Sequence, residues 1–379
     1  MFPYIIVAIL FIVLNCFTSN KNKIHKAFLL LFILALLACF RADTVGTDTK
    51  NYLLTITRTT LSESSWNYVS EAEPGYNVIL GICNFLGIAP RVVLGFFNLI
   101  YLIGIFKFSK SRKCSVLLFA GLSLLLCHYL QSLNAVRQYF AIGLLLIYLS
   151  INKLQNYWGQ VKLMGAILLI GYLFHNSIWV LLIYPLYNIV NDKFDIDRKE
   201  KSLKKIYVIA LVGTFILFYI DAFALIAETL QTLYMINDKA TAYFQGAAEK
   251  VETREVYSMV RMILDNSFVG YLLFVSRKVN VYTFLFVFGQ ICVNLFAPIN
   301  PIFTRLSVGL FVLGLPYVID CYYKSKNIRL TRMIILGYSL IFFGDKIKEK
   351  FKSYRANNAN SNYKQCLNAK NYCTCNSCG

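Results

Sequence analysis

The feature that most constrains this chain is a series of apolar runs that follow one another along almost its whole length. A helix needs roughly 20 mostly apolar residues to cross a bilayer. With 58% hydrophobic and 15% charged residues and a mean hydropathy of +0.56, the 379-residue chain is too apolar for a soluble protein of its size. We therefore predict an all-α polytopic membrane protein with about 11–12 transmembrane helices and additional re-entrant or periplasmic helical segments. The predicted spans are 2–17, 26–41, 91–107, 114–131, 135–151, 162–174, 177–190, 206–223, 262–276, 281–296 and 303–321.

Basic residues in the short segments between these runs set the orientation of the helices. Lys and Arg beside membrane helices are retained on the cytoplasmic side. The anchors are Lys21/Lys23/Lys26, Lys107/Lys110/Arg112/Lys113, Lys153/Lys162, the run 193–205, Arg277/Lys278 and Lys324/Lys326/Arg329/Arg332. Placing all of them inside puts the N-terminus outside. The net charge of +19 then reflects contact with anionic lipid headgroups, and nucleic acid is not an expected partner.

Three apolar segments need separate treatment. Pro3–Cys16 has no basic residue before it and no small-residue cleavage site after it, so we expect a transmembrane helix and not a signal peptide. If Pro74–Ile88 crossed the membrane, the basic loop at 107–113 would lie outside the cytoplasm. We therefore expect Pro74–Ile88 to form a re-entrant or interfacial helix. The run 333–343 is short, and a crossing exports the basic stretch 346–352; we favour a re-entrant or surface helix over a crossing.

The domain organisation follows from these spans. Residues 1–345 form a single integral membrane domain with periplasmic loops at about 42–90 and 224–261, and residues 346–379 form a basic tail that contains Asn and Cys. We expect this tail to be disordered. A zinc site made by its cysteines is the alternative, although no histidine accompanies them and their spacing fits no standard finger.

With this topology the polar groups that interrupt the apolar pattern fall on the outer side. The first group is the motif Arg41-x-Asp43-x-x-Gly-Thr-Asp48, which follows a membrane helix. An arginine held by carboxylates is preorganised to bind a phosphate. The alternative is a loop in which Asp48 caps the next helix and Arg41 snorkels to the interface.

Two further arginines lie in the first turns of predicted membrane helices. Arg137 is followed by Gln138, and Arg305 follows two prolines. Intramembrane charges usually face the interior of the bundle, so both arginines are candidates for fixed cations in a polar cavity. Snorkelling is the alternative for Arg137.

The remaining polar groups lie at a hairpin tip and in the longest polar loop. His175 interrupts an apolar run, and a histidine near neutrality can take a proton from a hydroxyl, so it is the first candidate for a general base and Asp48 the second. A structural role at the tip is the alternative. In the loop 224–261 we expect Tyr243 to contact sugar and Arg254 or Arg261 to reach phosphates, unless this loop is an amphipathic helix on the membrane surface.

Several catalytic motifs are missing. The sequence has no Gly-rich phosphate loop of the Walker type, no dinucleotide fingerprint, no Gly-x-Ser-x-Gly and no His-Glu-x-x-His. ATP hydrolysis, hydride transfer and zinc proteolysis are therefore unsupported, and we predict no cofactor and no metal.

The ordered motifs resemble those of the bacterial O-antigen and exopolysaccharide polymerases of the Wzy and EpsG type. The matching pieces are Arg41 to Tyr52, Asn134 to Ala141, Phe174 to Ser177 and Phe303 to Arg305. Each piece is short, but their order along the chain and their shared position at the outer face of the membrane agree with the family up to about residue 345. The cysteine-containing tail is not part of the pattern.

The resemblance implies a metal-independent glycosyltransferase of the inner membrane that acts in O-antigen, lipopolysaccharide or exopolysaccharide biosynthesis. Such an enzyme transfers the growing glycan from undecaprenyl diphosphate to the non-reducing end of a new lipid-linked repeat at the periplasmic face. A departing diphosphate develops charge that preorganised arginines stabilise. The partners that the resemblance implies are the lipid-linked oligosaccharide, membrane lipid and a chain-length regulator protein. Our candidates for the arginine clamp are Arg41, Arg137, Arg254 and Arg305.

Three other functions compete with this one. A flippase for lipid-linked oligosaccharide also needs arginines in a cavity, but the sequence shows no internal repeat and its polar groups gather at one face. An O-antigen ligase uses the same donor. A purely structural membrane protein is the remaining alternative.

Overall fold

The computed structural model describes residues 2–16, 23–41, 48–58, 60–61, 66–67, 73–152, 156–195, 199–219, 256–296 and 305–348. Within these ranges the chain is helical apart from one ladder of two-residue antiparallel strands, β1 (Thr60–Leu61) and β2 (Trp66–Asn67), which confirms the predicted all-α fold. The helices are α1 (Phe2–Cys16), α2 (Lys23–Cys39), α3 (Thr49–Arg58), α4 (Pro74–Phe85), α5 (Pro90–Ser111), α6 (Val116–Leu125), α7 (His128–Ser132), α8 (Val136–Ile151), α9 (Tyr157–Phe174), the 3-10 helix η2 (Asn176–Leu182), α10 (Ile183–Phe194), α11 (Glu200–Tyr219), α14 (Val256–Val275), α15 (Val281–Phe296) and α16 (Arg305–Lys324). A last helix covers residues 328–348.

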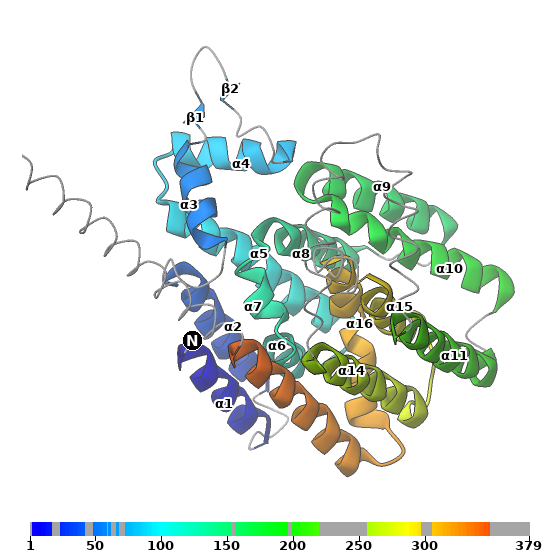
Figure 1. The fold of residues 1–379 in the computed structure, drawn as a ribbon. Helices are drawn as coiled ribbons and strands as arrows, with labels where there is room; N and C mark the ends of the chain where they lie inside the picture. Colours follow the sequence, from blue (N-terminus) through cyan, green and yellow to red (C-terminus); the bar gives the residue numbers. More distant parts are fainter. Residues whose placement is uncertain are drawn as a thin grey trace, which may run out of the picture.

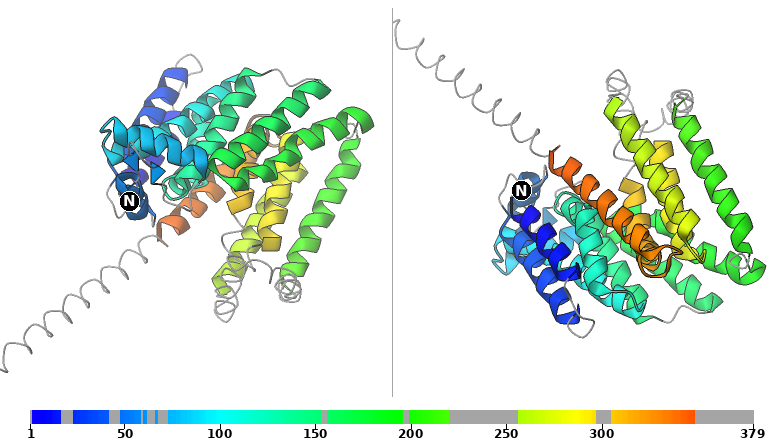
Figure 2. Two further views of the ribbon diagram at one scale, coloured as in Figure 1. Left: turned by 90° about the horizontal axis from the view of Figure 1, so that it is seen from above. Right: turned by 90° about the horizontal axis from the view of Figure 1, so that it is seen from below.

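Three of the described helices, α5, α9 and α16, are long and apolar enough to cross a membrane, and shorter apolar helices accompany them. In α16, 78% of the apolar window is buried within the protein, whereas in α9 only 28% is buried. This difference agrees with their places in the bundle, because α16 runs through its middle and α9 lies at its edge (Figure 1, Figure 2).

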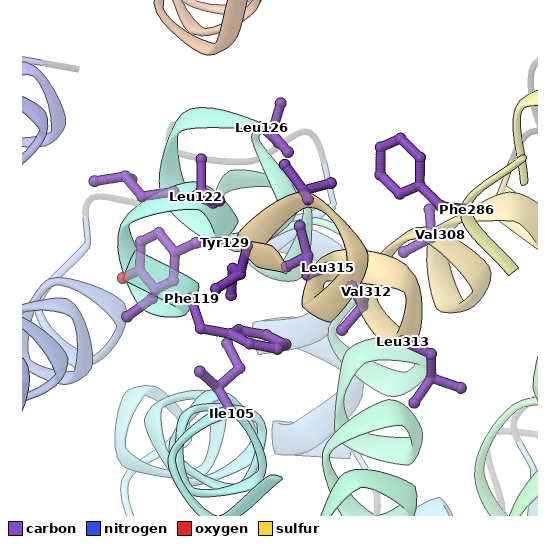
Figure 3. Packing of buried hydrophobic residues seen from close by; sticks show 14 of the residues in the cluster. Ile105, Phe119, Leu122, Leu126, Tyr129, Phe286, Val308, Val312, Leu313 and Leu315 are labelled. Carbon is purple, nitrogen blue, oxygen red and sulfur yellow. The ribbon is translucent and has the colours of Figure 1, made fainter. Parts of the chain in front are cut away.

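The core of the bundle forms where α6 packs against α16. Phe119 and Leu122 of α6 lie beside Val312 and Leu315 of α16, and all four side chains are fully buried (Figure 3). Such dense apolar packing fixes the position of α16 relative to the helices around it. It therefore also fixes where the first residue of α16, Arg305, is presented.

Local sequence signals explain where several helices begin. Pro74 and Pro90 occupy the first turns of α4 and α5, where the missing amide hydrogen of proline costs no helical bond. The side chain of Ser115 accepts a hydrogen bond from the backbone of α6, and that of Asn156 does the same for α9.

The predicted span 114–131 is not one helix. It divides into α6 and α7 because Cys127 adopts a left-handed backbone conformation, with φ of 61°. The break keeps its backbone paired, since the amide of Cys127 donates to Leu124 and its carbonyl accepts from Gln131. As a result α7 turns the His128 side chain into the interior, where it is 6% exposed.

The helix that contains the segment 333–343 is longer than its apolar run. This segment belongs to a continuous helix over residues 328–348, which at about 1.5 Å per residue is roughly 30 Å long. Tyr338 and Asp345 of this helix contact Asp265 and Arg261 of α14. The helix packs into the bundle because its polar side chains find partners there.

The segment Pro74–Ile88 forms α4, followed by a turn at Leu86 and Gly87. Together with α3 and the β1–β2 ladder, α4 forms a group at one edge of the bundle (Figure 1). Its first residues lie where α3, α8 and α16 begin and α9 ends. We call this end of the molecule the site end.

The most extensive helix contact joins α5 and α8 and depends on two glycines. A Cβ atom on Gly143 would lie 2.7 Å from Cα of Tyr101, and one on Gly104 would lie 2.7 Å from the carbonyl oxygen of Gly143. Both obstacles are backbone atoms, which cannot rotate away. Gly143→Ala is therefore expected to destabilise the protein by about 1–3 kcal/mol, seen as a lower midpoint of thermal unfolding in detergent. Gly165→Ala in α9 is the matched control, because its Cβ meets nothing within 4 Å, and equal midpoints would refute the prediction.

Candidate active site

Arg137 is the centre of the polar cluster at the site end. It lies in the first turn of α8, and its Nη1 atom is 2.5 Å from Oε2 of Glu73, the residue that precedes α4. Its guanidinium carbon lies 5.6 Å from the centre of the Tyr76 ring, and its side chain is hydrogen bonded to Tyr52 of α3. Three elements thus hold one guanidinium group in place, while 27% of the Arg137 side chain stays exposed to a ligand. A fixed guanidinium fork of this kind suits a phosphate oxygen pair.

Asp48 and Tyr52 reach the same cluster from the start of α3. The amide of Tyr52 donates to the carbonyl of Asp48 at 2.9 Å, which places both residues in the first turn of the helix. The Tyr52 hydroxyl lies within electrostatic reach of Asp48, Arg137 and Arg305. Burial raises the pKa of Tyr52, so this hydroxyl stays protonated and available for hydrogen bonding.

His175 joins the cluster from the break between α9 and η2. Its backbone is extended, and its Nδ1 atom accepts a hydrogen bond from the amide of Ser177 at 3.2 Å and lies 2.8 Å from the Ser177 hydroxyl. Because Nδ1 is the acceptor, the proton of the neutral imidazole belongs on Nε2. His175 therefore offers an N–H donor at Nε2, whereas the sequence suggested a general base.

The charge state of His175 follows from its surroundings. Burial, with the nearby guanidinium groups of Arg137 and Arg305, lowers its pKa from 6.5 to about 4. A group with this pKa is neutral from about pH 5 upward. The imidazole consequently does not add a third positive charge to the two arginines.

Arg305 connects the cluster to the interior of the bundle. It begins α16 and is exposed, and its carbonyl oxygen accepts a hydrogen bond of 2.6 Å from Nε2 of Gln138. Arg305 and Gln138 both line a cavity of about 380 Å³ that extends between α8, α14, α15, α16 and the helix over residues 328–348. A volume of this order is within the range of ligand pockets, about 300–1,000 Å³.

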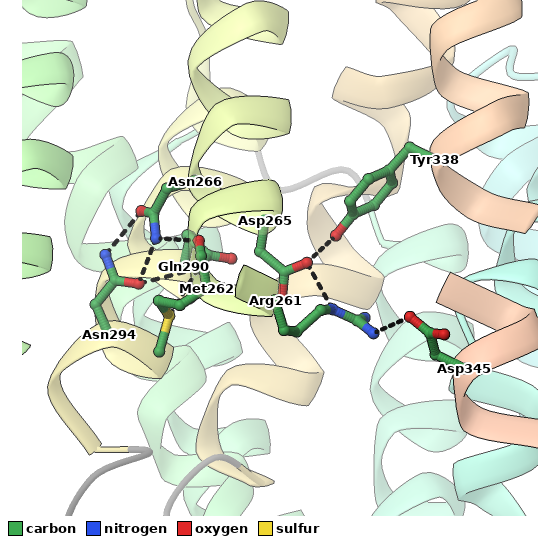
Figure 4. A network of polar contacts seen from close by, with 8 residues as sticks. All are labelled: Arg261, Met262, Asp265, Asn266, Gln290, Asn294, Tyr338 and Asp345. Atoms are coloured by element: carbon green, nitrogen blue, oxygen red, sulfur yellow. Dashed lines mark hydrogen bonds and ion pairs between the residues drawn. The ribbon is translucent and has the colours of Figure 1, made fainter. Parts of the chain in front are cut away.

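Arg261 lines the same cavity but is already neutralised (Figure 4). Its Nε atom is 2.8 Å from Oδ1 of Asp265, and its Nη1 atom is 3.6 Å from Oδ2 of Asp345. The same Asp265 oxygen accepts a 2.7 Å hydrogen bond from the Tyr338 hydroxyl, and the guanidinium carbon lies 3.7 Å from the centre of the Phe342 ring. These contacts account for Arg261 structurally, so it is poorly placed for the phosphate role that the sequence suggested.

Arg41 lies away from the cavity. It is 5% exposed and sits among Tyr4, Cys39 and Tyr129, and its carbonyl accepts a hydrogen bond from Arg91. Its three guanidinium nitrogens are buried and have no hydrogen-bond partner among the described residues. Of the four arginines that we expected in the clamp, Arg137 and Arg305 therefore come together, Arg41 lies outside the cavity that Arg305 lines, and Arg254 lies outside the described residues.

The candidate residues thus fall into three groups. The structure brings Arg137 and Arg305 within electrostatic reach of His175, places Asp48 near them through Tyr52, and hydrogen bonds Gln138 to the carbonyl of Arg305. Arg41 approaches this group only through Tyr52, and Arg261 is paired with Asp265 and Asp345. Asp43, Tyr243 and Arg254 lie outside the described residues.

Sequence reasoning missed the partners of Arg137. Glu73 had a usable signal, because a carboxylate directly before Pro74 stands at the start of an apolar helix. Tyr52 and Tyr76 carried no comparable signal, since aromatic residues are common throughout this chain and only the packing of α3 and α4 selects these two.

Comparison with known proteins gives one match. The family model described as the EpsG family matches residues 26–365, which is most of the chain and includes every residue of the cluster at the site end. Searches of curated proteins and of solved structures gave no match.

Proposed function

Because the chain belongs to the EpsG family, we propose that it elongates a polysaccharide by transferring the growing glycan from undecaprenyl diphosphate to the non-reducing end of a new lipid-linked repeat unit. Family membership supports a polysaccharide polymerase-like role in general. The apolar helices and the family agree in making it a membrane protein. The donor, the acceptor and the direction of transfer are the proposal.

One observation carries this proposal: two guanidinium groups from separate helices and a neutral histidine face one another at one end of the bundle. In the reaction, the bond between the anomeric carbon and the phosphate oxygen breaks, and its electron pair stays on the departing diphosphate. Arg137 and Arg305 stabilise that charge, and Glu73 holds the Arg137 guanidinium in place before the reaction begins. Nε2 of His175 donates a hydrogen bond to the same anion.

The acceptor hydroxyl forms the new bond to the anomeric carbon and loses its proton to a base. Since Nδ1 of His175 is already an acceptor for Ser177, we assign this role to the Asp48 carboxylate. Tyr52, hydrogen bonded to Arg137 and close to Asp48, positions both groups. The polyprenyl chains lie along the apolar flanks of the helices. The site end faces the periplasm of a bacterial inner membrane. A chain-length regulator protein is a further partner.

The assay that tests this function uses purified wild-type protein in liposomes with the lipid-linked repeat unit as substrate. A polymerase produces a ladder of longer lipid-linked glycans without nucleotide and without added metal. Movement of single repeats across the bilayer with no ladder would identify a flippase. Transfer of glycan to lipid A core, again without a ladder, would identify a ligase.

The proposed role of His175 gives a pH-dependent prediction. Because burial and the two nearby arginines lower the pKa of His175 to about 4, and because Nε2 keeps its proton in both charge states, titration of His175 is expected to give no acid limb of kcat/KM near pH 6.5. His175→Gln keeps an N–H donor at the position of Nε2 and is expected to retain activity. His175→Ala loses about 10- to 100-fold, as expected for one hydrogen bond to a charged group. An acid limb near 6.5 that disappears in His175→Gln would instead identify a titrating base.

A further inference from the structure

The cavity beneath Arg305 has a lining that differs from the arginine cluster above it. Its polar members are mainly amide, hydroxyl and imidazole groups, and aromatic rings such as Phe268 and Phe311 contribute much of the rest. Its charged members are Arg305, Lys346 and the ion pair of Arg261 with Asp265, and Lys346 lies within electrostatic reach of Asp265. Apart from Arg305, the cations among the described lining residues thus have a carboxylate nearby.

Three lining residues contain a buried polar atom with no hydrogen-bond partner in the described ranges: Oε1 of Gln138, Oδ1 of Asn134 and Nδ1 of His128. Gln138 is 1% exposed and His128 is 6% exposed. The orientation of the Gln138 amide is fixed, because its Nε2 donates to the carbonyl of Arg305. Its unpaired atom is therefore an acceptor. Native proteins rarely leave buried acceptors unpaired, which points to a ligand that donates hydrogen bonds.

These unpaired acceptor atoms suit some parts of a lipid-linked glycan and not others. A diphosphate is itself an acceptor and would be repelled by the Gln138 and Asn134 oxygens. A polyprenyl chain has no donor to give them. A sugar ring carries several hydroxyl donors and one apolar face, which suits amide oxygens on one side and an aromatic ring on the other.

We propose that this cavity is a saccharide subsite, which holds a sugar ring of the glycan directly below the diphosphate cluster. The inference rests on the proposed function, because it assigns the carbohydrate part of the same substrate. The hydroxyl groups donate to Gln138 and Asn134 and bond to Nδ1 of His128. The ring packs near Phe311, whose centroid lies 6.4 Å from that of the His128 ring. The cavity of about 380 Å³ leaves room for such a ring without movement of the helices.

The test measures binding of two separate probes to the full-length protein in detergent by equilibrium dialysis. One probe is undecaprenyl diphosphate without sugar. The other is the free repeat oligosaccharide, released by mild acid from the lipid-linked repeat of a strain that lacks this protein. The variants are Gln138→Met and His128→Phe, which keep the size of each side chain and remove its hydrogen-bonding atoms. The matched control is Gln160→Met in α9, also a buried glutamine, which hydrogen bonds to Asn188 and does not line the cavity.

Each cavity variant is expected to weaken oligosaccharide binding about tenfold, and the control alters neither probe. Undecaprenyl diphosphate binding is expected to stay unchanged in His128→Phe, because Gln138→Met also removes the hydrogen bond to the carbonyl of Arg305. Unchanged oligosaccharide binding in both variants, or no binding by the wild type, overturns the subsite and indicates a cavity filled by water alone. If the variants weaken binding of undecaprenyl diphosphate and leave oligosaccharide binding unchanged, the saccharide subsite is overturned in favour of a lipid site. If the wild type elongates glycans and only the oligosaccharide result fails, the subsite is wrong and the proposed function stands. Absence of elongation refutes the function itself.

Discussion

Replacing Arg137 by alanine is expected to lower the rate of glycan elongation by about 10²–10³-fold, the usual loss when one preorganised charge-stabilising donor is removed from an active site. Arg137 is the better anchored of the two arginines, since Glu73, Tyr52 and Tyr76 all contact it. Arg305→Ala should give a loss of the same order, because Arg305 acts on the same group of charges. The readout is the rate at which long lipid-linked glycans appear in the liposome assay.

Two controls separate this catalytic effect from a folding effect. Arg137→Lys keeps the charge near Glu73 but removes the planar fork, so it should remain folded and still elongate slowly. Arg112→Ala removes an arginine that lies beside Phe108 and Leu149, away from the site end, and should elongate at the wild-type rate. Long polymer made at normal rates by Arg137→Ala, with the protein in the membrane, would exclude Arg137 from the mechanism.

The largest loss of stability is expected from Asp265→Ala. The side chains of Arg261 and Asp265 are only 17% and 14% exposed, and the substitution deprives both Arg261 and Tyr338 of their acceptor (Figure 4). Removing one member of a buried ion pair typically costs about 3–5 kcal/mol, because the other charge stays buried without its partner. Asp345 is 3.6 Å from Arg261 and compensates only in part. The effect should appear as a large fall in the midpoint of thermal unfolding in mild detergent.

The matched control is Asp320→Ala, which breaks an i,i+4 pair with Lys324 that is largely exposed, at 46% and 70%. Exposed pairs contribute about 0–1 kcal/mol, so this midpoint should hardly change. The double variant Arg261→Met with Asp265→Leu should recover most of the stability lost by Asp265→Ala, since apolar groups of similar volume remove the unpaired charge. Equal midpoints for Asp265→Ala and Asp320→Ala would show that the network has no structural role.

Some residues of the candidate site could be predicted from the sequence, but their arrangement could not. Arg137, His175 and Arg305 could be selected in advance, because each is a polar residue at the end of an apolar run. Their grouping depends on helix packing, which also buries Arg41 outside the cavity and pairs Arg261 with Asp345 from far along the chain. The ring nitrogen of His175 that carries the proton is set by the hydrogen bond from the amide of Ser177, two residues later. This hydrogen bond accompanies an extended backbone at His175, which only the structure shows.

The sequence by itself determined the all-helical class, most helix positions and the family, because apolar runs, helix-starting prolines and motif order are local properties of the chain. It did not determine the break at Cys127, the full extent of the helix over residues 328–348, or the choice of arginines that meet. Those features were decided by the tertiary structure. The rotation of each helix about its axis sets the direction of its side chains, and that rotation is fixed by contacts between distant segments, such as the glycine contact of α5 with α8.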